Sequence, residues 1–227
     1  MKLIMFDVDG TLTDTTAVDA RCFIVALNDA FRIAVAEIDW SKYKYVSDEG
    51  LSSEIFEEHF HRPPTREEME RVKNSYVRAL QREIAASRNC SLEIPGAVAA
   101  MQRLKQLPQY AVSIATGCWK ESAALKLQTA GFDFEKIPMA SSSDSIERTV
   151  IMQMVLDRAR EQYRTDHFEQ VVYVGDGVWD ATASAELNYQ FIGVGVGAEK
   201  EKLIRAGARV IIPNYLDFEL FEKLLTS

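Results

Sequence analysis

The sequence has few cysteines and few histidines, three of each in 227 residues. Cys22, Cys90 and Cys118 are odd in number, widely spaced and without a CxxC pair. This pattern argues against a disulfide scaffold and indicates free thiols in a reducing compartment. His59 and His61 form an isolated pair without a third ligand nearby, which argues against a zinc site.

Long apolar runs, basic runs, internal repeats and low-complexity tracts are also missing. No apolar stretch approaches the length that spans a membrane, and the chain begins with a strand-like segment rather than a signal-peptide pattern. The formal net charge of −8 disfavours non-specific binding to nucleic acid. With 47% hydrophobic residues the chain can bury a substantial core, so we expect a soluble cytoplasmic protein that binds neither nucleic acid nor membrane.

The most informative segment lies at the N-terminus. Residues 3–6 are continuously apolar, as in a strand buried on both faces of a parallel sheet. Asp7 and Asp9 follow at the end of this strand, where open α/β sheets bind ligands, and alternate residues of an extended segment face the same way. Gly10 lets the backbone turn sharply. Two carboxylates held this close need a cation or a proton, so the segment predicts metal-dependent carboxylate chemistry.

Residues 15–94 carry only helical patterns, with apolar residues at near-helical spacing. Residues 42–51 mix aromatic, charged and glycine residues and are expected to form a loop. Thr65 and Glu68 have the spacing of a capping box and predict a helix start after the two prolines at 63 and 64. We interpret residues 15–94 as an inserted all-helical cap.

From residue 95 onward, strand and helix patterns alternate, which predicts a parallel sheet with helices on both faces. Strands are expected at 3–6, 110–115, 137–140, 171–174, 191–196 and 209–212. Helices are expected at 97–107, 120–130, 147–164, 178–187 and 199–205. The predicted fold is therefore α/β, a Rossmann-like core of residues 1–14 and 95–227 that carries the cap.

Two further strand ends carry polar residues. Thr116 and Gly117 follow the strand at 110–115 and place a hydroxyl and free N–H groups at a helix start, which suits an anion. Asp176 and Asp180 follow the strand at 171–174, and a set of oxygen-only ligands is typical of Mg²⁺. Thr116 could instead be a plain helix cap, and Asp180 could simply complement a helix dipole.

A cation for the same edge of the sheet is expected at Arg148. Asp144 is a candidate N-cap with Glu147 three residues on, which would put Arg148 in the first turn of its helix. No lysine occurs between Lys136 and Lys200, so an arginine must supply this charge. The alternative is that Arg148 is a solvated helix residue.

The acidic, hydroxyl and cationic residues stand in the order of the four motifs of the haloacid dehalogenase-like hydrolase superfamily: Asp7, Asp9, Thr116, Arg148, Asp176 and Asp180. The chain resembles the phosphatase branch, especially phosphoglycolate-phosphatase-like members with a helical cap. The cationic motif of this family is more often a lysine. Arginine suits phosphate equally well, but the departure weakens kinship with phosphoglycolate phosphatases proper.

The resemblance implies a role for each motif residue. Asp7 would attack phosphorus and form an aspartyl-phosphate, and Asp9 would protonate the leaving alcohol and later deprotonate water. Mg²⁺ would be held by Asp7, by the backbone carbonyl of Asp9 and by Asp176, with Asp180 in support. The phosphoryl oxygens would be bound by the three remaining positions, namely Thr116, Gly117 and Arg148. The expected function is an Mg²⁺-dependent phosphomonoesterase for a small phosphorylated metabolite.

Several alternatives stay open at this point. Asp9 argues against a dehalogenase, because cleavage of a carbon–halogen bond needs no leaving-group acid. A phosphomutase acting on a sugar phosphate would use the same two acids, and a catalytically silent binding protein could keep the fold. Cys118 is either a low-pKa thiol at a helix start or a small buried residue. The loop at 45–51 is the expected selector of substrate, with Lys44, Ser47 and Asp48 as possible contacts.

Overall fold

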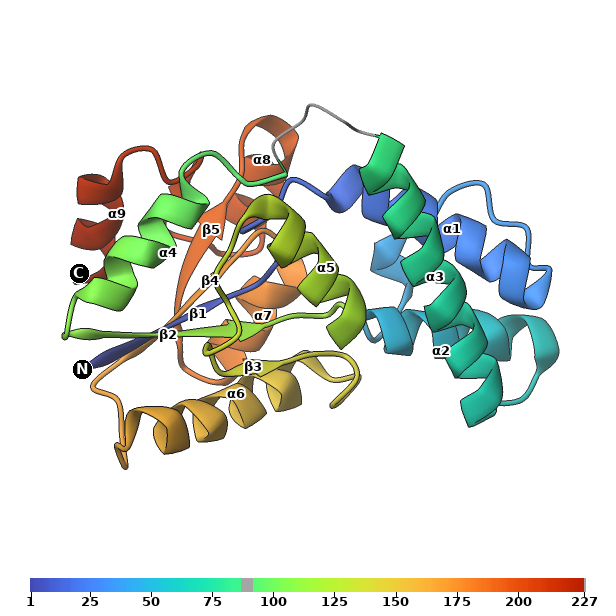
Figure 1. The fold of residues 1–227 in the computed structure, drawn as a ribbon, viewed down its shortest axis with the longest axis horizontal. Coiled ribbons are helices and arrows are strands. Elements are labelled where there is room, and N and C mark those ends of the chain that lie inside the picture. The colour runs from blue at the N-terminus through green and yellow to red at the C-terminus, as the bar shows by residue number, and fades with distance from the viewer. Residues whose placement is uncertain (87–91, 227) are drawn as a thin grey trace.

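The structure, a computed structural model, describes residues 1–86 and 92–226 (Figure 1). Its described residues form a six-stranded parallel sheet in the order β3-β2-β1-β4-β5-β6. The strands are β1 (Lys2–Phe6), β2 (Tyr110–Ala115), β3 (Met139–Ala140), β4 (Val171–Gly175), β5 (Gln190–Val194) and β6 (Ile211–Ile212). The predicted Rossmann-like α/β fold is confirmed. Because β1 lies between β2 and β4, the residues after these three strands meet at one edge.

Helices cover both faces of the sheet (Figure 1). They are α4 (Ala97–Gln106), α5 (Lys120–Ala130), α6 (Arg148–Tyr163), α7 (Val178–Glu186), α8 (Gly197–Arg205) and α9 (Phe218–Leu225). The alternation of side chains along β1 divides the core. Ile4 and Phe6 belong to the cluster under α4, α5 and α9, while Leu3 and Met5 belong to the cluster under α6 and α7. Burial on both faces explains the unbroken apolar run in this strand.

The helical insert lies beside the sheet and has a hydrophobic core of its own (Figure 1). It contains α1 (Thr16–Phe31), the 3₁₀ turn η1 (Trp40–Lys42), α2 (Asp48–Phe60) and α3 (Arg66–Ala86). Phe23, Phe56 and Tyr76 are among its buried residues, and Trp119 from the segment after β2 packs with them. The segments that enter and leave the insert lie side by side, because the Ile94 N–H donates to Leu12 O. The boundaries at 15 and 94 stay a prediction.

Most predicted helices agree with the structure to within two residues, and the capping box of Thr65 and Glu68 is formed. The predicted loop at 42–51 is wrong at its end, because Ser47 caps α2 by accepting from the Gly50 N–H and the helix begins at Asp48. The strands expected at 137–140, 191–196 and 209–212 are shorter or shifted, as their bounds show. They lie at or near the sheet edge, where fewer ladder bonds define the ends.

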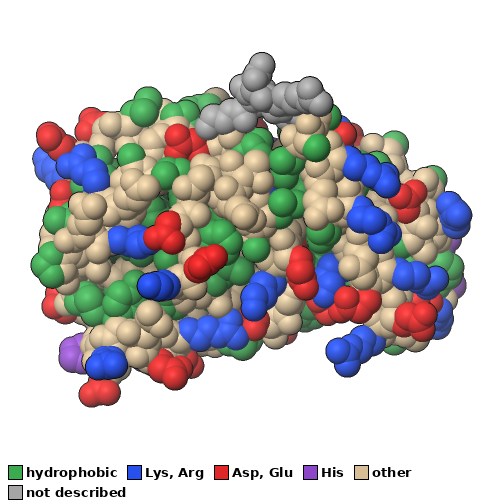
Figure 2. Space-filling model, in the orientation of Figure 1, with side chains coloured by type: hydrophobic (Ala, Val, Ile, Leu, Met, Phe, Trp, Pro, Cys, Tyr) green, Lys and Arg blue, Asp and Glu red, His purple; other side chains and the backbone are tan. Residues whose placement is uncertain are grey.

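The predicted N-cap of α6 is also wrong. Asp144 accepts from the Ser141 N–H and forms an ion pair with Arg158, so α6 begins at Arg148 with Glu147 in the cap position. Cys90 lies outside the described residues. No described helix has the length and apolar character needed to cross a membrane. On the face shown in Figure 2, acidic and basic side chains are interspersed.

Candidate active site

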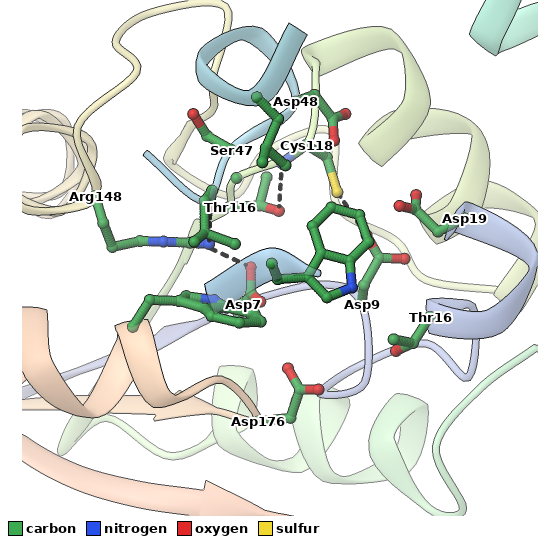
Figure 3. Close-up of a pocket in the computed structure, with 15 residues that line it drawn as sticks. Asp7, Asp9, Thr16, Asp19, Ser47, Asp48, Thr116, Cys118, Arg148 and Asp176 are labelled. Atoms are coloured by element: carbon green, nitrogen blue, oxygen red, sulfur yellow. Dashed lines mark hydrogen bonds and ion pairs between the residues drawn. The ribbon is translucent and has the colours of Figure 1, made fainter. Parts of the chain in front are cut away.

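A pocket opens at the carboxyl edge of the sheet, between the core and the helical insert (Figure 3). Every strand end singled out in the sequence contributes to it: Asp7 and Asp9 after β1, Thr116 and Gly117 after β2, and Asp176 after β4. The start of α6 adds Arg148, and the insert adds residues from α1, η1 and the start of α2. The structure therefore brings together residues that the sequence separates by more than a hundred positions.

Asp7 is buried at the centre of the site. Its N–H donates to Val174 O at 3.0 Å, which continues the ladder between β1 and β4 and fixes the backbone. Its Oδ1 lies 3.3 Å from Arg148 Nη1. Burial raises the pKa of the Asp7 carboxyl above its ordinary value, and the neighbouring Arg148 only partly opposes this effect. The Asp7 carboxyl thus lies beside the Arg148 guanidinium in a position shielded from water.

Arg148 connects three parts of the site. Besides Asp7, its Nη2 donates to Val46 O at 3.2 Å and its Nε lies 3.5 Å from Asp180 Oδ1. Burial alone would lower the pKa of Arg148, but Asp180 and Asp7 raise it overall, so the guanidinium stays charged. Gly117 allows this contact, because a Cβ there would lie 2.7 Å from Nη2. Arg148 thus lies at the first residue of α6 and lines the pocket, although Asp144 does not cap the helix.

Three carboxylates form a cluster that suits a divalent cation. Oxygens of Asp7, Asp176 and Asp180 all lie within 4.8 Å of one another. Burial and mutual repulsion raise the pKa of Asp176 well above its ordinary value and that of Asp180 to about 7. An oxygen-only set of this kind fits Mg²⁺, which would relieve the repulsion. Gly10 is required here, since its φ is +68° and a Cβ would lie 2.0 Å from Asp176 Oδ2.

The members of the cluster are held differently. Asp180 is fully buried at the first turn of α7, where it accepts from the Gly177 N–H at 3.0 Å and the Tyr173 hydroxyl at 3.3 Å. It does not line the pocket, whereas Asp176 does. Asp180 therefore adjoins the cluster from the protein interior and not from the pocket.

Asp9 has a separate set of partners. Its carboxylate accepts from the Thr15 hydroxyl, the Cys118 thiol and Lys126 Nζ, the last at 2.6 Å. Burial by itself would raise the pKa of Asp9, but Lys126 and the hydrogen bonds from Cys118 and Thr15 outweigh it and lower the pKa overall. The carboxylate is not part of the acidic cluster. Its backbone carbonyl as a metal ligand stays a prediction.

Thr116 is fully buried, and its hydroxyl accepts from the Cys118 N–H at 3.2 Å. The hydroxyl also lowers the pKa of Asp7 by a hydrogen bond, although burial dominates that pKa. The pKa of Cys118 is raised well above its ordinary value by burial and by Asp9. This favours the small buried residue over the low-pKa thiol.

The structure adds two charged residues, Lys126 and Asp19, that the catalytic motifs do not contain. Lys126 on α5 is fully buried and pairs with Asp9 and also with Asp19 on α1, which in turn accepts from the Tyr76 hydroxyl. The available signal was a lysine on the apolar face of a helix, next to Leu127.

Asp48, one of the possible substrate contacts, lines the pocket with Ser47. Lys44, the third, does not line it and bonds the Tyr45 hydroxyl instead.

Comparison with known proteins gives a family and a fold. A family model described as haloacid dehalogenase-like hydrolase matches residues 1–188. No curated protein gives a significant match. A hydrolase from Pseudomonas syringae is 23% identical, with a TM-score of 0.75 over 100% of both chains. A predicted phosphoglycolate phosphatase from Haemophilus somnus is 16% identical, with a TM-score of 0.66 over 98% of both chains.

A candidate beta-phosphoglucomutase from Bacteroides vulgatus is 15% identical, with a TM-score of 0.72 over 100% of this chain and 89% of that one. These structural likenesses concern the fold. The family model, in contrast, covers most of the sequence, including all six residues of the predicted motifs. The chain therefore belongs to the haloacid dehalogenase-like hydrolases.

Proposed function

We propose that this protein is a Mg²⁺-dependent phosphomonoesterase that hydrolyses a small phosphorylated metabolite through an aspartyl-phosphate. The observation that carries the proposal is the position of Asp7, whose carboxylate lies both beside the Arg148 guanidinium and within the acidic cluster. A phosphoryl group needs a nucleophile and positive charge on its oxygens at the same place. Asp7 and Arg148 supply these two requirements.

In the first half of the reaction an oxygen of the Asp7 carboxylate attacks phosphorus and the bond from phosphorus to the leaving oxygen breaks. Arg148, the Thr116 hydroxyl and the Gly117 N–H bind the phosphoryl oxygens. Asp9 gives its proton to the leaving oxygen, so the alcohol departs neutral. The bound Mg²⁺, held by Asp7 and Asp176 with Asp180 in support, would neutralise charge on the phosphoryl oxygens.

In the second half Asp9 removes a proton from water, the resulting hydroxide attacks phosphorus, and the bond to Asp7 breaks to release phosphate. The contact with Lys126 favours ionised Asp9, which is the form that this second step needs. The acid step needs Asp9 protonated, and we therefore expect its carboxylate to leave Lys126 when substrate enters.

The test is hydrolysis of an aryl phosphate and of a panel of phosphorylated metabolites, with Mg²⁺ or with EDTA. Asp7→Asn should abolish turnover, whereas the matched control Asp14→Asn, an exposed acid in the same segment, should retain it. An acid-quenched reaction should contain protein heavier by one phosphoryl group, and this species should be absent in Asp7→Asn. Full activity of Asp7→Asn would refute the mechanism, and isomerised sugar phosphate in place of free phosphate would indicate a mutase.

A further inference from the structure

The pocket has an uneven distribution of charge. Five of the residues that line it are carboxylates and one is a cation, Arg148. In Figure 3, Arg148 lies on the left and Asp9 and Asp19 lie on the right, with Asp7 between them, while Asp48 lies at the top of the site. If the phosphoryl group of a substrate sits between Arg148 and Asp7, its alcohol extends toward the acidic side.

The acids on that side differ in how they are compensated. Asp9 and Asp19 share the buried ammonium of Lys126. Asp48, in contrast, has only neutral donors: its Oδ2 accepts from the Trp119 N–H at 2.8 Å and from the Ser122 hydroxyl at 3.5 Å. Within the described chain no lysine or arginine forms an ion pair with Asp48. Burial and the neighbouring Asp19 raise its pKa well above the ordinary value, and the charge of Lys126 opposes this only in part. Asp48 therefore has no ion pair, and an ammonium group that entered the pocket would favour its ionised form.

Two indole rings line the same pocket. Trp40, in η1, is half-buried with its ring 6.3 Å from that of Phe23, and Trp179, at the start of α7, is also half-buried. The face of an indole attracts cations, and aromatic side chains that surround a pocket recognise ammonium ligands in this way. The insert and the core each contribute one ring to this pocket.

We propose, on the basis of the function proposed above, that the substrate is the phosphomonoester of a small alcohol that carries an ammonium group. The ammonium would approach Asp48 and the two indoles while Arg148 and the acidic cluster hold the phosphoryl end. A second anionic group would be disfavoured, because Arg148 is the only cation that lines the described pocket and it already contacts Asp7. A carboxylate on the alcohol would instead face Asp48 and Asp19.

Three two-carbon phosphomonoesters that differ only in their terminal group test this inference: 2-aminoethyl phosphate, 2-hydroxyethyl phosphate and phosphoglycolate. We expect kcat/KM to fall in that order, with the ammonium ester at least about tenfold above the carboxylate ester, the size of one charge interaction of about 1.4 kcal/mol. Equal rates, or preference for the hydroxyl or carboxylate ester, would refute the inference.

Two variants locate the effect. Asp48→Asn keeps an oxygen for the Trp119 N–H but removes the charge, and it should reduce the ratio of ammonium to carboxylate ester about tenfold. The matched control is Glu49→Gln, the next residue of α2, which bonds the Trp119 indole N–H and does not line the pocket. Its ratio should be unchanged. If Asp48→Asn fails to fold, the ester series on the unaltered protein still decides the inference.

Binding separates this inference from the proposed activity. Titration calorimetry of Asp7→Asn with each ester and Mg²⁺ should give the same order of affinities without any turnover. If no ester is hydrolysed by the unaltered protein, the phosphomonoesterase proposal fails while the order of binding still decides the inference. Equal binding of the three esters refutes the inference even if all three are hydrolysed.

Discussion

Replacement of Lys126 by methionine should destabilise the protein strongly. The Lys126 side chain has no exposed surface, and its Nζ pairs with Asp9 and Asp19, whose side chains are 19% and 13% exposed. Methionine keeps most of the aliphatic stem, so the loss comes from two buried carboxylates without their shared cation. Breaking a buried ion pair by removing one partner typically costs about 3–5 kcal/mol, and two acids lose their partner here. We expect a loss of about 4 kcal/mol at pH 7.

The assay is urea denaturation followed by tryptophan fluorescence, with Lys105→Met as the matched control. Lys105 pairs with Asp133 at the surface, where the Asp133 side chain is 76% exposed, so its loss should be within about 1 kcal/mol. The double variant Lys126→Met, Asp19→Asn should recover part of the loss, because one of the two unpaired charges is gone. Lys126→Met as stable as Lys105→Met would refute this reasoning.

The loss should also depend on pH, with a sign that follows from Asp9. Its pKa in the folded protein lies below the ordinary value of 3.8, so the pair contributes stability above that value and loses it as the pH falls through the folded pKa. Lys126→Met removes this contribution. The difference between variant and unaltered protein should therefore be largest at neutral pH and shrink in acid, as the unpaired Asp9 and Asp19 of the variant take up protons.

Three other predictions concern the acidic cluster and its cation. Gly10→Ala should abolish Mg²⁺-dependent activity, because the new Cβ would lie 2.0 Å from Asp176 Oδ2; unchanged kcat/KM would contradict the close approach. Arg148→Lys should lower kcat/KM by roughly 10- to 100-fold, since one ammonium cannot replace the contacts with Asp7, Asp180 and the loop carbonyl; an unchanged rate would show that only charge matters. Affinity for Mg²⁺, measured by calorimetry, should fall as the pH drops through about 7, where Asp180 takes up a proton; a flat profile from pH 8 to 6 would exclude Asp180.

The sequence predicts the fold and the positions of the motif residues because both depend on local patterns. Asp7 and Asp176 follow apolar strands, and parallel strands have their carboxyl ends at one edge, so their proximity needs no knowledge of side-chain packing. The sequence places Arg148 at a helix start through a cap at Asp144 and the absence of a nearby lysine; the structure does not contain this cap, yet α6 begins at Arg148.

The contacts between the insert and the core could not be predicted in this way. Lys126 and Asp19 are 107 positions apart and meet only because α1 of the insert lies beside α5 of the core. Nothing in the spacing of either residue indicates the other. The lysine on an apolar helix face signals that a buried acid exists, but the identity of this acid depends on tertiary structure. The same limit applies to Asp48, whose α2 was expected to begin later than it does.

Asp7 and Asp9 illustrate how the surroundings shift the pKa values of two neighbouring acids in opposite directions. Both are buried, and burial alone would raise the pKa of each. Asp7 shares its arginine with Asp180 and faces other carboxylates, so its pKa stays raised and a metal ion is the natural compensation. Asp9 pairs with Lys126, which it shares with Asp19, and accepts from one hydroxyl and one thiol, so its pKa is lowered without any metal. The ionisation of Asp7 therefore depends on what the pocket binds. The ionisation of Asp9 depends on the helical insert, because Lys126 also pairs with Asp19. A change in the position of the insert would alter the partner of Asp9, the proposed acid–base group, before it altered the surroundings of Asp7, the proposed nucleophile.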